Sequence, residues 1–109
     1  MAVYVDDMNA SFGRLKLSHL IADSDEELHA MADRIGVDRK WWQAPKGGSG
    51  SHYDIALSKK TLAIQLGAIL ITWRQTGAMN ARRRITGELG KPEDAVAWLK
   101  AYLAARKAS

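Results

Sequence analysis

The feature that most constrains the fold is a short amphipathic helix that leads at once into an apolar run. Within residues 59–66, Leu62, Ala63 and Leu66 share one face at helical spacing, and Gly67 ends the helix. Residues 68–73, with the sequence AILITW, form one apolar run, which is typical of a strand buried on both faces. A helix followed directly by such a strand predicts an α/β layer.

Strands and helices on either side of this unit complete the expected fold. Residues 2–6 and 15–21 predict two strands, and residues 52–57 predict an extended segment. Ser24 and Glu27 form a capping box for a helix that Gly36 ends, and Pro92 begins a last helix with a broad apolar face. The expected fold is therefore α/β, with a small single-layer sheet of about three to four strands packed by helices and with a C-terminal helix.

Length and charge indicate one domain with a basic end. The 109 residues fit one domain, in which residues 1–74 form the α/β core and residues 75–109 form a basic connector and an amphipathic helix. Residues 1–73 carry eight Lys and Arg against nine Asp and Glu, and residues 74–109 carry eight against three, so the net charges are −1 and +5. This asymmetry predicts that Arg82, Arg83 and Arg84 contact nucleic acid without sequence specificity; the alternative is a solvated face.

The composition also narrows the cellular setting. Cysteine is absent, which excludes disulfides and thiolate metal ligands. No signal-peptide pattern opens the chain, and the most apolar run, residues 66–73, is too short to cross a bilayer. We therefore expect a cytoplasmic protein with no membrane contact. The apolar face of the last helix predicts packing on the sheet, or contact with a protein partner or a second copy in a homodimer.

The main candidate site lies within the decapeptide SHYDIALSKK that begins at residue 51. If this segment is extended, His52 and Asp54 lie on one face, where a carboxylate can fix the tautomer of a neighbouring imidazole. Such a pair acts in acid–base chemistry or forms a structural hydrogen-bonded corner. Ser58 predicts a helix N-cap, with Lys59 and Lys60 in the first turn; the two lysines contact a phosphate or carboxylate, or are simply solvated.

A combination of short pieces runs through the first two thirds of the chain. The pieces are Val3-Tyr4-Val5-Asp6-Asp7, Ser18-His19-Leu20-Ile21-Ala22-Asp23, Glu27-Leu28-His29, Ile35-Gly36-Val37, Trp41-Trp42-Gln43, His52-Tyr53-Asp54, and Ala63 with Gly67-Ala68. Together they resemble a family of small bacterial and bacteriophage domains of unknown function. The resemblance covers residue 1 to about 74 and implies no known activity.

These pieces contain all three histidines of the chain and most of its candidate site residues. The catalytic candidates are Asp6, His19, His52 and Asp54; the ligand-binding candidates are Asp7, His29, Tyr53, Lys59 and Lys60. If they converge, imidazoles and carboxylates suit a divalent metal or acid–base work on a phosphorylated substrate, although no H-E-x-x-H spacing is present. The short loop at residues 7–14 favours an antiparallel hairpin, which would send Asp6 and Asp23 to opposite ends. His19 alternates with apolar residues, so a core histidine is the alternative.

Three functions are compatible with these features. The first is binding of a phosphate-containing ligand, a nucleotide or nucleic acid. The second is a small hydrolase that acts on a nucleotide or nucleic acid, either with a divalent metal as cofactor or through a His/Asp acid–base pair. The third is a phage accessory protein that binds a host protein.

Overall fold

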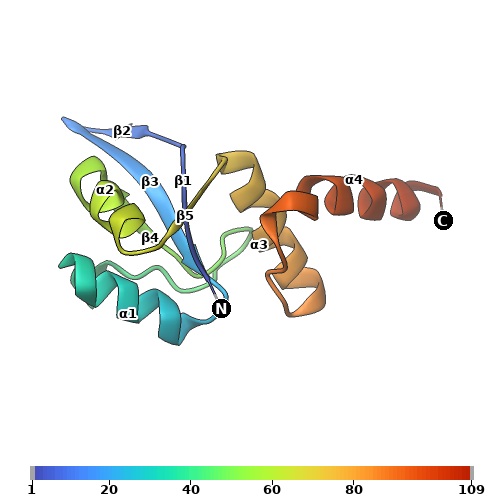
Figure 1. The fold of residues 1–109 in the computed structure, drawn as a ribbon. Coiled ribbons are helices and arrows are strands. Elements are labelled where there is room, and N and C mark those ends of the chain that lie inside the picture. The colour runs from blue at the N-terminus through green and yellow to red at the C-terminus, as the bar shows by residue number, and fades with distance from the viewer. Residues whose placement is uncertain (1, 109) are drawn as a thin grey trace.

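The computed structural model describes residues 2–108 as a mixed α/β fold, in which strands from residues 3–71 form one sheet with helices on both faces (Figure 1). The sheet has five strands in the described part of the chain, one more than the largest number expected. The α/β class and the C-terminal helix are confirmed. The elements in order are β1 (Val3–Asp6), β2 (Ala10–Phe12), β3 (Leu15–Ala22), α1 (Asp25–Ile35), a short 3-10 helix (Arg39–Trp41), β4 (Tyr53–Ala56), α2 (Leu57–Gln65), β5 (Ile69–Ile71), α3 (Trp73–Thr86) and α4 (Pro92–Ala108).

The long strand β3 is the centre of the sheet. One edge of β3 pairs antiparallel with β1 and then with β2, while the other edge pairs antiparallel with β4, so Leu20 lies between Val5 and Tyr53. Strand β5 runs parallel to β1 at the outer edge. The antiparallel β1–β3 pairing was expected from the short loop, and it does place Asp6 and Asp23 at opposite ends, because Val3 pairs with Ala22.

Alternation along the strands divides the core between the two faces of the sheet. On one face, Val5, Leu20 and Tyr53 pack with residues of α1 and α2. On the other face, Tyr4 and Ile21 pack with residues of α3 and the start of α4. Because successive residues point to opposite faces, the position of a residue in a strand decides which helical layer it meets.

The Ser24 N-cap and the Gly36 end of α1 are confirmed, but the Glu27 carboxylate accepts from the Ser24 hydroxyl at 2.9 Å, so the capping box is not completed through the Ser24 N–H; the signals around α2 and β5 also need correction. The Ser24 side chain accepts a hydrogen bond from the Glu27 N–H, and Gly36 ends α1 with φ 77°. Ser58 is not the N-cap of α2: β4 turns directly into the helix, which begins at Leu57 after Ala56 and has no side-chain cap. Strand β5 is not buried on both faces: it lies at the edge of the sheet that residues 2–108 form, and Ile69 and Leu70 are 47% and 56% exposed.

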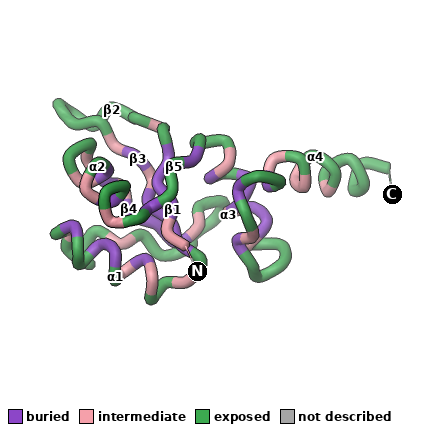
Figure 2. The backbone as a smooth tube through the Cα atoms, viewed as in Figure 1, coloured by how far each residue is buried: buried purple, intermediate pink, exposed green. Residues whose placement is uncertain are grey.

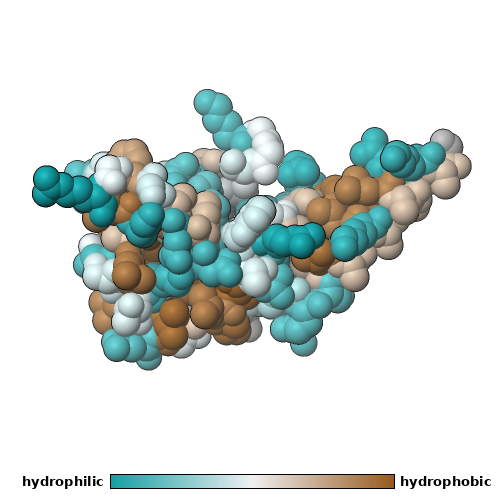
Figure 3. All heavy atoms as spheres, turned by 90° about the horizontal axis from the view of Figure 1, so that it is seen from above, coloured by the Kyte–Doolittle hydropathy of each residue, from teal (hydrophilic) through white to brown (hydrophobic). Residues whose placement is uncertain are grey.

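The basic segment after β5 is a regular helix rather than a partly helical connector. Thr72, expected to lie in the strand, instead caps α3 in a capping box with Gln75. Helix α3 buries Ala78 and Met79 against the sheet. Figure 2 shows that burial fades along α4, whose C-terminal half extends away from the body as an exposed arm, and Figure 3 shows apolar atoms on that arm. Within residues 2–108 no helix has the length and apolar character needed to cross a membrane.

Candidate metal centre

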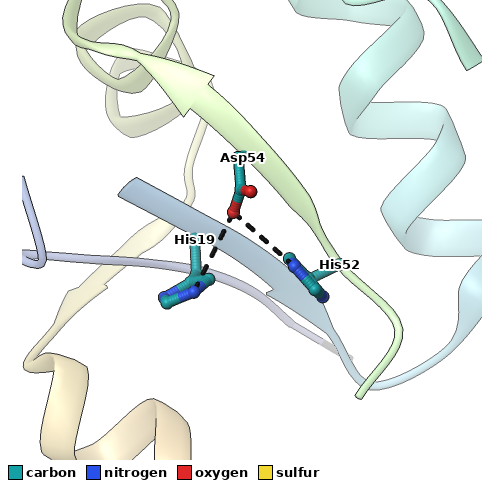
Figure 4. Close-up of side chains that lie close together, drawn as sticks. All are labelled: His19, His52 and Asp54. Atoms are coloured by element: carbon teal, nitrogen blue, oxygen red, sulfur yellow. Dashed lines mark ion pairs between the residues drawn. The ribbon is translucent and has the colours of Figure 1, made fainter. Parts of the chain in front are cut away.

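Three polar side chains meet on the sheet face that carries Ile21, the face covered by α3 further along. His19 comes from β3, Asp54 from the paired position of β4, and His52 from the residue just before β4 (Figure 4). His52 and Asp54 share a face, as the period of two predicts. Asp54 Oδ1 lies 3.9 Å from His19 Nε2 and 3.6 Å from His52 Nε2, and one ligand atom from each of the three residues lies within 4.8 Å of the others.

The second nitrogen of each imidazole is committed to an acceptor on the protein. His52 Nδ1 lies 2.6 Å from the Gly50 carbonyl oxygen, which can only accept, so this nitrogen carries the proton. His19 Nδ1 lies 2.7 Å from Asp6 Oδ2 and donates to that carboxylate. In the neutral form both rings therefore present an Nε2 lone pair toward Asp54. Fixing the tautomer through the far nitrogen is how proteins orient imidazole ligands of metals.

The Asp6 carboxylate contacts both the ring and the backbone of His19. The carboxylate is fully buried where the β1–β3 pairing ends, and its Oδ1 accepts from the His19 N–H at 2.9 Å and from the Met8 N–H at 3.1 Å. Burial raises the pKa of Asp6, but the hydrogen bonds from His19 and Met8 outweigh it and the net pKa is lowered. The same hydrogen bond from Asp6 raises the pKa of His19. Asp6 is thus an ionised group that holds His19 in place, and it is not one of the three residues of the cluster.

One carboxylate oxygen in the cluster has no partner. Gln43 Nε2 donates to Asp54 Oδ2 at 2.8 Å, and two backbone hydrogen bonds hold Gln43 opposite His52. Asp54 Oδ1, in contrast, is buried and accepts no hydrogen bond from any residue in the range 2–108. An unpaired buried carboxylate oxygen is costly, and here it faces two nitrogen lone pairs. A bound cation would coordinate the carboxylate oxygen and both imidazole nitrogens.

The spacing of the cluster is close to that of a metal site. Four ligands at 2.0–2.1 Å in a tetrahedron are separated by about 3.3 Å. The two distances to Asp54 Oδ1 are 3.6 and 3.9 Å, and all three ligand atoms lie within 4.8 Å of one another, so modest side-chain movements would bring them to metal-binding distance. The His19 and Asp54 side chains are 28% and 31% exposed, which leaves one side of the cluster open to solvent. Three protein ligands with an open position are the pattern of catalytic rather than structural metal sites.

An apolar cleft adjoins the cluster. It has a volume of about 600 Å³ and shares Asp54 and Gln43 with the cluster. Phe12 and Trp41, 69% and 61% exposed, contribute aromatic surface to it, and Lys59 adds a cation. Of the two lysines predicted to contact an anion, Lys59 therefore faces the cleft, while Lys60 is a buried residue of α2.

Three other candidates lie away from the cluster. The Asp7 carboxylate accepts a hydrogen bond from the N–H of Trp73, the first residue of α3, at 2.8 Å. Tyr53 points to the opposite face of the sheet, where its hydroxyl shares a 2.6 Å hydrogen bond with His29 Nδ1. The His29 ring also meets Trp42 edge-on, with ring centroids 5.1 Å apart.

Of the three consecutive arginines of α3, Arg82 points toward α4, whereas Arg83 and Arg84 point toward β3 and the loop before β4. Arg82 is buried, forms an ion pair with Asp94 at 3.1 Å and lies over the Trp98 ring, so it joins α3 to α4. Arg83 Nη1 donates to the Ala22 carbonyl at 2.8 Å. Arg84 reaches the Gly48 carbonyl at 3.4 Å. Helical geometry turns successive residues by about 100°, so the run does not make one basic face.

Two groups that shape the cluster were not selected from the sequence. The Gly50 carbonyl sets the His52 tautomer, and a backbone group carries no residue-type signal. Gln43 belongs to one of the recognised pieces, but its contact with Asp54 depends on the bridge between Gln43 and His52, which closes the variable loop between them.

Comparison with known proteins gives one family and no further relatives. No curated protein and no solved structure matches the chain. A family model described as "Protein of unknown function (DUF4031)" matches residues 3–83, which extends the region of resemblance through most of α3. The match includes every residue of the His19–His52–Asp54 cluster and its supports Asp6 and Gln43. The chain therefore belongs to the DUF4031 family of proteins of unknown function.

Proposed function

We propose that His19, His52 and Asp54 bind a divalent transition metal and that the protein is a metal-dependent hydrolase. The observation that carries this proposal is the convergence of two imidazole Nε2 atoms on a buried carboxylate oxygen that accepts no hydrogen bond from residues 2–108. Imidazole and carboxylate ligands suit Zn²⁺, Mn²⁺, Fe²⁺ or Co²⁺, and two histidines with one carboxylate leave coordination positions free.

A metal accounts for the geometry better than an acid–base pair does. Protonation of His19, whose pKa is raised by Asp6, would place an N–H opposite Asp54 Oδ1. At 3.9 Å the two atoms are too far apart for a hydrogen bond. A metal ion between the ligands satisfies His19, His52 and Asp54 together, while a proton satisfies one pair at most.

The residues around the cluster fit hydrolysis. A divalent metal in such a site activates water near neutral pH and polarises a carbonyl or phosphoryl oxygen of a substrate. Asp6 and the Gly50 carbonyl hold the two imidazoles in place, and the solvent-open side of His19 and Asp54 leaves room for a substrate. The adjoining cleft offers Phe12 and Trp41 for an apolar or aromatic part of that substrate and Lys59 for an anionic group.

Metal titration of chelator-treated protein tests the proposal. We expect calorimetry with Zn²⁺ to show one ion per chain, and Asp54→Asn and His19→Gln to weaken binding by at least about a hundredfold. His29→Gln is the matched control, because it removes the histidine on the opposite face, which is engaged by Tyr53. Absence of stoichiometric binding, or an equal loss in the His29 variant, would contradict the proposal.

A second measurement tests the chemistry separately from binding. Metal-loaded protein should hydrolyse at least one class in a panel of chromogenic phosphate monoesters, phosphate diesters and carboxylic esters, and chelation should abolish the turnover. Metal binding without turnover of any class would support the site but overturn the hydrolase assignment.

A further inference from the structure

A second cavity lies beyond the glycine-rich loop, separate from the metal cluster. Its volume of about 510 Å³ falls in the range of about 300–1,000 Å³ that small-molecule sites occupy. It lies between the start of α1, the loop that precedes β4, and the C-terminal half of α3. Three cations line it: Lys46 from the loop, and Arg83 and Arg84 from α3.

Arg83 is the central charge of this cavity and is incompletely paired. Its Nη1 donates to the Ala22 carbonyl at 2.8 Å, but its Nη2 is buried without a hydrogen-bond partner in the described part of the chain. No carboxylate from residues 2–108 lies within ion-pair distance of it. Burial lowers the pKa of Arg83, and the more distant attraction of Asp25 and Asp23 offsets this only in part. The guanidinium therefore retains unused donor capacity.

The two carboxylates that line the cavity are already engaged. Asp25 Oδ1 accepts from the Ser51 hydroxyl at 2.7 Å, and Asp23 Oδ2 accepts from the Ala2 N–H at 2.8 Å. Arg84 is exposed and makes only a long 3.4 Å contact with the Gly48 carbonyl, so it is free to turn toward a ligand. The cavity thus has a net positive charge and donors that lack strong acceptors.

We propose that this cavity binds the phosphoryl group of a small phosphate ester, with Arg83 and Arg84 donating to its oxygens. Guanidinium groups bind phosphate through paired, charge-assisted hydrogen bonds. Lys46, Arg83 and Arg84 all line this one cavity, whereas Arg82 turns away to pair with Asp94. A small phosphate fits this arrangement, whereas nucleic acid would need a track of cations along the helix.

The loop places this site next to the metal cluster. Gly50 lines the cavity, and its carbonyl accepts the His52 Nδ1–H. Gly50 also packs so closely on α3 that a Cβ there would lie 2.5 Å from Asn80 Oδ1. The same short segment is thus a wall of the phosphate cavity and the support of a metal ligand. Phosphate binding requires no metal, so the two proposals stand or fall independently.

Calorimetry with inorganic phosphate, adenosine monophosphate and a single-stranded oligonucleotide tests the proposal on the full chain in chelator. We expect phosphate and the nucleotide to bind wild-type protein, and Arg83→Met and Arg84→Met each to weaken binding by roughly tenfold or more. Arg14→Met, at an exposed arginine in the turn between β2 and β3, is the control and should bind as wild type does.

Arg84→Met keeps the test decisive if Arg83→Met unfolds, because Arg84 is exposed. The proposal is overturned if neither phosphate nor the nucleotide binds, or if Arg84→Met and a folded Arg83→Met bind as tightly as wild type. Binding of the oligonucleotide alone, weakened equally by Arg14→Met, would also overturn it and would indicate a diffuse polyanion surface.

Discussion

Two histidine clusters lie on opposite faces of the same sheet, and their difference separates a structural cluster from a candidate site. On the α1 side, His29 shares a hydrogen bond with the Tyr53 hydroxyl and packs edge-on against the rings of Trp42 and Tyr53. On the α3 side, His19 and His52 direct their Nε2 atoms at Asp54 Oδ1, which accepts no hydrogen bond within residues 2–108. In the first cluster the His29 and Tyr53 side chains pair with each other, whereas in the second a buried carboxylate oxygen has no hydrogen-bond partner among residues 2–108.

This difference arises because the side chains of residues 52–54 alternate between the two faces of the sheet. Tyr53 enters the core with Leu20 and Leu28, while His52 and Asp54 face the other way. Neighbouring polar residues therefore join different clusters, because alternate residues of a strand face opposite sides of the sheet. The predictions below change one cluster while the other serves as its control.

The largest effect is expected from Asp54→Asn. Loss of the only carboxylate in the cluster should weaken metal binding by at least about a hundredfold. In chelator, the variant should unfold at the same denaturant concentration as wild type or a higher one, because the unpaired buried oxygen no longer carries charge. Chemical denaturation with and without Zn²⁺ measures both effects. A variant that is clearly less stable in chelator would show that Asp54 is structural.

Metal should stabilise the wild-type fold by mass action. At a free concentration roughly a hundredfold above its dissociation constant, a ligand that binds only the folded state adds about 2.7 kcal/mol to the free energy of unfolding. Thermal melts should therefore shift upward with Zn²⁺ in wild type and in His29→Gln, and chelator should reverse the shift. Equal melting temperatures with and without metal would count against the cluster as a metal site.

Asp6→Asn tests the support behind His19. An amide cannot accept both the ring N–H and the backbone N–H as the carboxylate does, so metal affinity should fall by about 10–100-fold. In chelator the variant should also lose about 1–3 kcal/mol of stability. Unchanged affinity in a folded variant would show that Asp6 does not position the metal ligand.

The stability deficit of Asp6→Asn should depend on pH. The lowered pKa of Asp6 gives wild type an advantage that is present above pH 3.8 and lost as pH falls through the folded-state value. The raised pKa of His19 gives an advantage that is present below pH 6.5 and lost as pH rises through its folded-state value. Denaturation in chelator should therefore show the widest gap between pH 3.8 and 6.5. A gap that does not change with pH would argue against the ion pair.

The smallest effect is expected on the opposite face. Tyr53→Phe removes the hydroxyl that pairs with His29, and it should reduce the free energy of unfolding by about 1 kcal/mol. Metal affinity should not change. A loss of metal binding in this folded variant would show that the two clusters are not independent.

Local sequence patterns predicted the parts of the fold that depend on short-range rules. The caps of α1 and the shared face of His52 and Asp54 follow from spacing alone. The predicted N-cap at Ser58 was wrong. Strand β4 turns directly into α2, so the helix begins at Leu57 without a side-chain cap. Exposure of Leu70 depends on β5 lying at the edge of the sheet, which its apolar run does not encode.

The candidate site was only partly predictable for the same reason. Asp6 and His19 were selected as site residues, but their contact depends on the register of β1 against β3. The sequence predicted that Arg82, Arg83 and Arg84 contact nucleic acid or form a solvated face, and the structure shows that helical rotation directs Arg82 into the α3–α4 contact. Contact of Arg83 and Arg84 with a phosphate or nucleic acid stays a prediction, as do a cytoplasmic location and a homodimer through α4.

The most direct test of the central claim is an anomalous-scattering map from crystals of the protein grown with Co²⁺ or Zn²⁺. The metal-centre account predicts a peak within about 2.0–2.3 Å of His19 Nε2, His52 Nε2 and Asp54 Oδ1. A fully loaded crystal with no peak at these three atoms, or with its peak at His29, would contradict the account.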